Sequence, residues 1–388
     1  MIKVFEPRLS TKDKLSVLSS LNKSNISGSS EEVLKFESHL ARTFDRKFAV
    51  ALTNGTTALE VAVKSLDFNE GDEIIVPSFT IISCLSAIIR NGLTPVFCDV
   101  DPITWNMNID NVKRVTTKKT KGVLMVHTYG LPADATNIKN FCDDNNLKLI
   151  EDTAEAHGQL EKRKKCGSFG DVSTLSFYAN KHITTGEGGA VLTDSQELYD
   201  LMKQIINLDF KEPNRFNHKN LYWNYRISGI QASLGISQIN SLNKTINLKI
   251  KQGEAYNQLF KSHTDFLQIP LSNVNESKNH YWVYGLVLKK QNHRDKLMKY
   301  LFENDIQTRQ FFWPLHMQDS LPKKYRSINE NLSSAEYIGE NGLYIPIGPH
   351  LTFKKQKYVA QKIADIKNIS FEEVANTTTK NAVKFFGL

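Results

Sequence analysis

Hydrophobic and polar positions in the first half of the chain follow two alternating patterns. Residues 56–68 place Leu59, Val63 and Leu66 at helical spacing, and the apolar run that Gly92 closes is typical of a buried helix. The same half holds short segments that are apolar nearly throughout and end in polar residues: 72–79, 94–101, 122–130, 147–156, 172–178 and 189–194. Such strands, alternating with helices, predict a mostly parallel sheet covered on both faces, and therefore an α/β fold.

The pattern changes after about residue 240. Residues 243–263 form a long polar helical stretch, and shorter strand-like and helix-like segments follow it. We therefore expect two domains: a large α/β domain over residues 1–240 with an N-terminal arm, and a smaller α+β domain over residues 241–388. No role can be assigned to the C-terminal extension after about residue 366.

Composition narrows the class of protein further. The chain has 388 residues and a formal net charge of +8, but Lys and Arg are interspersed with Asp and Glu. This balance favours an anionic small substrate, with nucleic-acid binding as the alternative. The four cysteines show no CxxC spacing, so no metal site is expected. The N-terminus resembles no signal peptide, and no apolar run reaches the roughly 20 residues of a membrane helix. We expect a cytoplasmic protein with no membrane partner.

Polar side chains gather where the predicted strands end. His127, Asp152, Glu155 and Lys181 each follow or close an apolar segment. In open α/β sheets, ligands bind at the carboxyl ends of the strands. The pattern therefore places a binding site at this edge of the sheet.

A turn at residues 53–60, "TNGTTALE", leads from a strand-like segment into a helix. Free N–H groups at a helix N-terminus suit a phosphate, and Gly55 lets the backbone approach it closely. Thr56 and Thr57 are the candidate side-chain donors. A threonine cap with no ligand is the alternative, because such caps are common.

Two further segments supply chemistry that one cofactor requires. Asp152 ends a buried strand, where a carboxylate can keep the ring nitrogen of pyridoxal phosphate protonated. Glu155 lies three residues on, within reach of the ring hydroxyl. Lys181 follows the apolar run "STLSFYAN", and an enclosed lysine loses its proton readily and can form a Schiff base with an aldehyde. Solvated surface residues are the alternative for each group taken alone. A phosphate cradle, an acid for the ring nitrogen and a lysine follow one another in this order along one α/β domain. Together they predict a fold-type I pyridoxal-phosphate enzyme.

An ordered set of motifs resembles one family over nearly the whole chain. The stretches "NGTTALEVA", "VHTYG", "IEDTAEAHG", "GSFGDVSTLSFYANKHITTGEGGAV" and "WNYRISGIQASLG" resemble those of the DegT/DnrJ/EryC1/StrS sugar-nucleotide aminotransferases. In most members a lysine stands at the position of Lys181 and binds the cofactor covalently. In a subgroup of sugar 3-dehydratases a histidine stands there and another follows it. This chain keeps the lysine, with His182 after it.

The resemblance implies roles for individual residues. Lys181 is the nucleophile and proton carrier, Asp152 pairs with the ring nitrogen, and Ser176 binds the phosphate. Ile81 stands where most members place an aromatic residue on the cofactor ring, which implies somewhat weaker cofactor binding. Phe79, Tyr178 or an aromatic residue of a partner chain are the expected substitutes. Asn224 resembles an asparagine that reaches the phosphate from a neighbouring subunit, which implies a homodimer with shared sites. The candidate substrate-binding residues are Asn180, His182, Arg226, Arg309 and His316; for His182 a packing role is favoured.

The activity implied is transfer of the amino group of L-glutamate to a nucleotide-linked 4-keto-6-deoxy sugar, for surface polysaccharide. GDP-perosamine is the favoured product. UDP- or dTDP-linked sugars and amination at C3 are alternatives, as is a pyridoxal-phosphate-dependent 3-dehydratase.

Overall fold

The computed structural model describes residues 1–325 and 331–365. The predicted C-terminal extension lies outside these residues. Within them, no helix is both long and apolar enough to cross a membrane.

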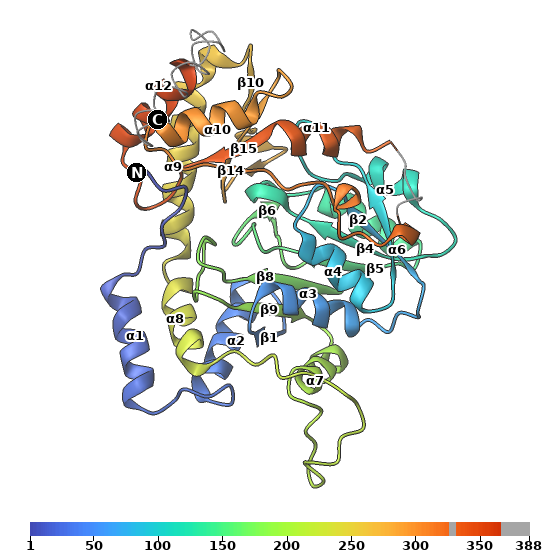
Figure 1. The fold of residues 1–388 in the computed structure, drawn as a ribbon. Helices are drawn as coiled ribbons and strands as arrows, with labels where there is room; N and C mark the ends of the chain where they lie inside the picture. The colour runs from blue at the N-terminus through green and yellow to red at the C-terminus, as the bar shows by residue number, and fades with distance from the viewer. Residues whose placement is uncertain (326–330, 366–388) are drawn as a thin grey trace, which may run out of the picture.

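A seven-stranded sheet forms the centre of the larger half (Figure 1). Its strand order is β1-β9-β8-β5-β4-β2-β3, and every pairing is parallel except those of β9 with β1 and β8. The strands are β1 Phe48–Leu52, β2 Glu73–Pro77, β3 Thr94–Cys98, β4 Thr120–Val126, β5 Lys148–Asp152, β8 Val172–Ser176 and β9 Gly189–Thr193. The predicted mostly parallel sheet is confirmed.

Helices cover both faces of this sheet and bury its strands on both sides. One face packs on α3 Gly55–Lys64, α4 Ile82–Arg90 and α7 Gln196–Ile205. The other packs on α5 Ile109–Val115 and α6 Ala135–Asp144 at one end, and on α2 Glu31–Thr43 and α8 Gly229–Ile239 at the other. Two short strands, β6 Leu160–Glu161 and β7 Lys164–Lys165, form a separate hairpin, and α1 Thr11–Asn22 packs on α8.

A smaller four-stranded sheet follows in the C-terminal part, above the first in Figure 1. Its order is β10-β13-β15-β14, antiparallel throughout, from β10 Leu267–Gln268, β13 Tyr284–Leu288, β14 Arg309–Gln310 and β15 Gly342–Ile345. Its core includes side chains of α9 Leu242–Leu259, α10 Arg294–Glu303 and α12 Phe353–Asp365. Two further strands, β11 Asn273–Val274 and β12 Ser277–Lys278, form a small hairpin, and α11 Ser333–Asn341 precedes β15.

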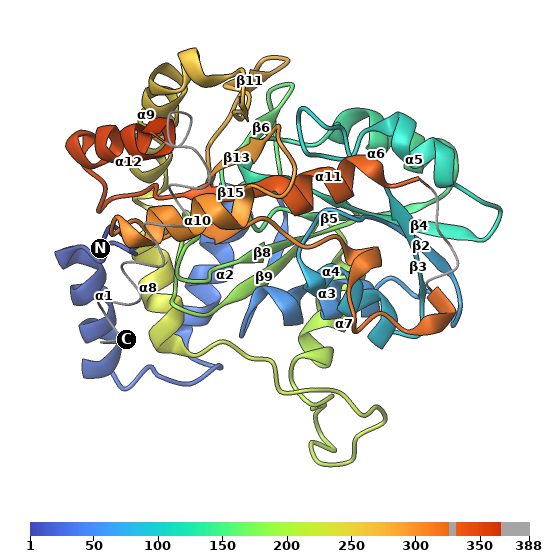
Figure 2. The same cartoon turned by 45° about the horizontal axis from the view of Figure 1, so that its top comes forward.

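The two sheets meet where the site lies. In Figure 2 the segments around β13 and β15 pass close to the ends of β5 and β8. An aromatic cluster joins the two parts: Tyr129 contacts the rings of Trp282, Phe311 and Tyr344. The site is therefore built from residues far apart in the sequence.

Candidate active site

A cavity of about 310 Å³ opens at the carboxyl ends of the parallel strands. The ends of β4, β5 and β8, the N-termini of α3 and α4, and segments of the smaller sheet line it. Nine of the residues predicted from the sequence lie in its wall: Gly55, Thr56, Ile81, Asp152, Glu155, Ser176, Asn180, Lys181 and Arg309. The volume suits a small-molecule ligand, and the position is that of ligand sites in open α/β sheets.

Lys181 is enclosed in this wall. Its side chain is 9% exposed, and its Nζ lies 3.5 Å from Glu155 Oε1 and 3.6 Å from the centre of the Trp282 ring. Burial lowers the pKa of the amine, while the carboxylates of Glu155 and Asp152 oppose the shift. An amine whose charged form is disfavoured is a better nucleophile near neutral pH.

Two buried carboxyl groups face the amine with different partners. Asp152 accepts a hydrogen bond from the Ala154 amide (2.9 Å) and another from the Cys84 thiol (3.5 Å), and burial raises its pKa. Glu155 accepts one from the Tyr129 amide (2.9 Å), and burial raises its pKa to about 7. A cation or hydrogen-bond donor that enters the cavity beside either carboxyl group would therefore stabilise its ionised form.

The N-terminus of α3 and the end of β8 form a cradle around Gly55. A Cβ at position 55 would lie 2.7 Å from Ser176 Cβ and 3.0 Å from its Oγ, closer than packed atoms tolerate. Only glycine therefore leaves the helix N-terminus this near to the Ser176 hydroxyl. Thr56 Oγ1 is also in the wall, bonded to Ser83 Oγ (2.8 Å). Helix N–H groups with two hydroxyls suit an anion such as a phosphate.

Thr57, another predicted phosphate donor, lies outside the wall of this cavity. Its amide donates to the Asn54 side chain (2.9 Å), and its hydroxyl accepts a hydrogen bond from the Asn54 amide (3.3 Å). The same hydroxyl donates to the Asn54 carbonyl (2.9 Å). These bonds form a reciprocal capping box at the start of α3. These bonds stabilise the helix N-terminus, and the role of Thr57 as a phosphate donor stays a prediction.

The wall opposite the sheet is aromatic, although Ile81 stands where an aromatic residue was expected. Ile81 is 39% exposed and borders the cavity at the start of α4. Phe79, an expected substitute, is fully buried outside the wall. Four aromatic side chains do line it: Tyr178, Trp282, Phe312 and Tyr344. Of these, only Tyr178 was anticipated, because the other three come from the C-terminal part of the chain.

Besides Thr57, four predicted residues lie outside the cavity wall of their own chain: His182, His316, Asn224 and Arg226. His182 is buried and bonds through Nε2 to the His280 carbonyl (3.3 Å), so its packing role agrees with the structure better than substrate binding. His316 is held between Ser78 Oγ (2.6 Å) and Glu336 (3.0 Å).

Arg226 and Asn224 also lie apart from the cavity and bond each other, with 2.9 Å between Arg226 Nε and Asn224 Oδ1. Arg226 further bonds Asn207 (2.8 Å). Neither side chain borders the cavity of its own chain.

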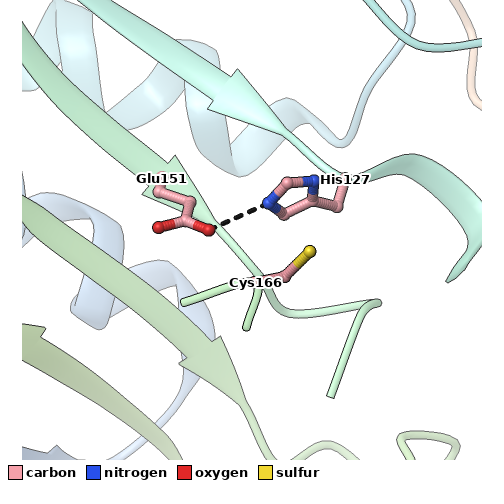
Figure 3. Close-up of side chains that lie close together, drawn as sticks. All are labelled: His127, Glu151 and Cys166. Carbon is pink, nitrogen blue, oxygen red and sulfur yellow. Dashed lines mark hydrogen bonds and ion pairs between the residues drawn. The ribbon is translucent and has the colours of Figure 1, made fainter. Parts of the chain in front are cut away.

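A buried group next to the site has the composition of a metal centre (Figure 3). His127, Glu151 and Cys166 offer ligand atoms within 4.8 Å of one another. His127 Nδ1 accepts the Ala133 amide (3.0 Å), so its Nε2–H donates to Glu151 (2.9 Å). Burial opposes the ionisation of Glu151, yet the His127 bond and backbone amides lower its pKa to about 2. His127 and Glu151 thus form a hydrogen-bond network at the end of β5, in which Glu151 also accepts the amides of Gly167, Phe169 and Gly170.

The arrangement fits pyridoxal 5′-phosphate. The cradle at Gly55 and Ser176 suits its phosphate, the buried Asp152 carboxyl suits its pyridine nitrogen, and the enclosed Lys181 amine suits its aldehyde. Fold and site together define a fold-type I pyridoxal-phosphate-dependent transferase.

The comparisons with known proteins identify the family. Residues 8–364 match the model of the DegT/DnrJ/EryC1/StrS aminotransferase family, and the chain belongs to this family. It is 34% identical to the GDP-perosamine synthase of Escherichia coli O157:H7, over 93% of this chain and 97% of that protein.

Solved structures agree with the fold. The aminotransferase from Psychrobacter cryohalolentis superposes with a TM-score of 0.87 at 27% identity, over 94% of this chain and 98% of the other. The E. coli GDP-4-keto-6-deoxy-D-mannose-3-dehydratase with bound hydrated PLP reaches 0.86 at 24% identity, over 93% and 99% of the two chains. At 24% identity, the similarity to the dehydratase supports the fold alone.

Proposed function

We propose that this protein is a pyridoxal-phosphate-dependent aminotransferase that moves the amino group of L-glutamate to a nucleotide-linked 4-keto-6-deoxy sugar. GDP-perosamine is the favoured product. The observation that carries the proposal is a buried lysine amine beside two buried carboxyl groups, Asp152 and Glu155, in a chain 34% identical to a GDP-perosamine synthase. UDP- and dTDP-linked sugars and C3 amination remain alternatives.

The bound cofactor supplies an electron sink that stabilises negative charge at the carbon losing a proton. The protein's residues do the rest. Lys181, whose cationic form burial disfavours, would bind the aldehyde of the cofactor and would carry a proton at its Nζ. Asp152 would keep the ring nitrogen protonated, and the N-terminus of α3 with Ser176 would hold the phosphate. Glu155, whose Oε1 lies 3.5 Å from Nζ, orients the amine and would hold the ring hydroxyl.

The surface of α1 supports a homodimer. Its buried side chains are the polar Asp13 and Ser20, whereas Leu15, Leu18 and Leu21 are 58%, 50% and 48% exposed. A helix that turns its apolar side to solvent in one chain is suited to cover by a second chain.

The loop between α7 and α8, which projects from the body in Figure 1, carries the fully exposed Leu221. Asn224 follows it. We infer that this loop reaches the neighbouring subunit and that Asn224 completes the neighbour's phosphate site.

Mixing two inactive variants tests the shared site. Lys181→Ala and Asn224→Ala chains, refolded or co-expressed together, form hybrid dimers in which one site carries both changes and the other carries none. Random pairing then restores about a quarter of the wild-type activity. If each site belongs to one chain, the mixture stays as inactive as its components.

Isotope transfer tests the reaction itself. The protein is incubated with ¹⁵N-glutamate and GDP-4-keto-6-deoxymannose, and the sugar nucleotide is analysed by mass spectrometry. Retained ¹⁵N supports the aminotransferase; a deoxygenated sugar without nitrogen indicates a dehydratase. A parallel panel of UDP- and dTDP-linked keto sugars identifies the nucleotide. The cytoplasmic location stays a prediction.

A further inference from the structure

The main cavity carries a guanidinium group that no carboxylate neutralises. Arg309, in β14, is exposed and stands in the cavity wall. Among residues 1–325 and 331–365, no Asp or Glu side chain forms an ion pair with it. Burial raises the pKa of the Tyr344 hydroxyl in the same wall, and the charge of Arg309 and a hydrogen bond from it oppose this shift. A guanidinium without a carboxylate partner in a ligand cavity suits a carboxylate or a phosphate.

The contact that orients Arg309 comes from the N-terminal segment. The Cζ atom of Arg309 lies 5.1 Å from the centre of the Phe5 ring. The same ring makes an edge contact with Tyr178, with 6.4 Å between the two ring centres. Tyr178 follows β8, whereas Arg309 belongs to the smaller sheet, and both line the cavity. Phe5 therefore joins the two parts of the wall that the large and the small sheet supply.

The backbone next to Phe5 is fixed beside the residues that lead into β14. Ile2 forms a parallel β-bridge with Ile306, and its carbonyl accepts a hydrogen bond from the Gln307 amide (2.9 Å). Val4 is 2% exposed, and its amide donates to the Gln307 side chain (3.1 Å). The segment that carries the ring and the strand that carries the guanidinium are thus held together by their own backbones.

Packing alone does not require an aromatic residue at position 5. Phe5 is half-buried, and a leucine would cover similar apolar surface. The face of an aromatic ring attracts a cation in addition, and it uses none of the five N–H donors of a guanidinium. A carboxylate in its place would neutralise Arg309 and occupy those donors. Phe5 therefore orients the guanidinium while leaving its charge and its hydrogen bonds to a ligand.

We propose that Phe5 is a positioning residue of the active site: its ring holds the Arg309 guanidinium in the cavity wall, where Arg309 binds an anionic group of a substrate. The inference rests on the proposed function, which offers two sources of such a group. One is a carboxylate of the amino donor, and the other is the diphosphate of the sugar nucleotide. Both present paired oxygen atoms that a guanidinium binds with two parallel hydrogen bonds.

The experiment measures anion binding by the full-length, cofactor-loaded protein without turnover. Isothermal titration calorimetry with glutarate reports on the carboxylate, and titration with GDP and UDP reports on the diphosphate. The variants are Phe5→Leu, Phe5→Tyr, Arg309→Gln and the double variant Phe5→Leu/Arg309→Gln. Phe353→Leu is the matched control, because Phe353 is an exposed ring outside the cavity wall with the Lys357 amine 4.8 Å from its centre. Circular dichroism confirms that each variant is folded, and Phe5→Met replaces Phe5→Leu if the latter is not.

Loss of the ring in Phe5→Leu should weaken binding of one class of anion about two- to fivefold, the factor that an exposed cation–π contact supplies. Phe5→Tyr and Phe353→Leu should bind like wild type. Arg309→Gln should weaken binding of the same anion about tenfold or more, and Phe5→Leu should add nothing in that background.

Three results overturn the proposal. They are wild-type affinity for every anion in Phe5→Leu or in Arg309→Gln, an equal loss from Phe5→Leu with and without Arg309, and a wild type that binds none of these anions. Failure of the proposed function would appear separately, as absent transfer of nitrogen from glutamate to any keto sugar by the wild type.

Discussion

Glu155 provides a quantitative test of how burial tunes this site. Its carboxyl group is 5% exposed, and burial raises its pKa from 4.5 to about 7. The folded chain therefore holds a proton that the unfolded chain has lost between these two pH values. The stability that Glu155 contributes is fully present below its unfolded-state pKa of 4.5 and is lost as the pH rises through its folded-state pKa of about 7. The shift corresponds to about 3 kcal/mol of unfolding free energy.

Glu155→Gln removes this titration while its amide oxygen can still accept the Tyr129 amide. Relative to wild type, the variant should gain about 2 to 3 kcal/mol of stability between about pH 5 and about pH 8. Loss of the Glu155 carboxylate also lowers the pKa of Lys181 further, because this carboxylate opposes the effect of burial on the amine. That change acts in the same direction, since a folded-state amine with a lower pKa costs less stability as the pH rises.

Urea denaturation of cofactor-free protein at the two pH values measures the difference. Glu187→Gln, which changes an exposed glutamate in the same cavity wall, is the matched control and should show no such gain. An equal stability difference between Glu155→Gln and wild type at both pH values would refute the reasoning.

Three further predictions address the cradle and the dimer. Gly55→Ala places a Cβ 2.7 Å from Ser176 Cβ. The unfolding free energy should fall by about 1–3 kcal/mol, although alanine has the better helix propensity. Cofactor affinity, measured by titration, should fall at least about tenfold. Wild-type cofactor affinity in this variant would show that the cradle at Gly55 does not bind the phosphate. Thr57→Val breaks a capping box, so denaturation should show a loss of about 0.5–2 kcal/mol with cofactor affinity unchanged; weakened binding without lost stability would instead make Thr57 a ligand. Leu18→Glu places a charge on the exposed apolar side of α1 and should shift light-scattering mass towards the monomer; an unchanged dimer would exclude α1 from the interface.

Most of the large sheet could be predicted, because its buried strands are apolar nearly throughout and can be recognised in the sequence. The apolar runs that end at Asp152 and Ser176 correspond to β5 and β8. Gly55, Asp152 and Lys181 could be found because each follows such a run, and strand ends meet at one edge of a parallel sheet. Local pattern is thus sufficient where one sheet positions the residues.

Other parts of the site depend on contacts that local pattern does not encode. Trp282 and Tyr344 reach the cavity from the smaller sheet, and only packing of the two parts brings them there. Thr57 illustrates the opposite difficulty: a threonine at a helix start suits a phosphate and a cap equally well, and only hydrogen-bond geometry separates them. Phe5 is one apolar residue of an N-terminal arm, and its contact with Arg309 emerges only in three dimensions.

The most direct test of the account is reductive trapping at Lys181. The purified protein, loaded with pyridoxal 5′-phosphate, is treated with borohydride, digested and analysed by peptide mass spectrometry, with Lys181→Ala as the control. The account predicts a stable phosphopyridoxyl group on Lys181 and none at this position in the variant. Unmodified Lys181 in protein that has bound the cofactor, or a modification carried by another lysine, would contradict it.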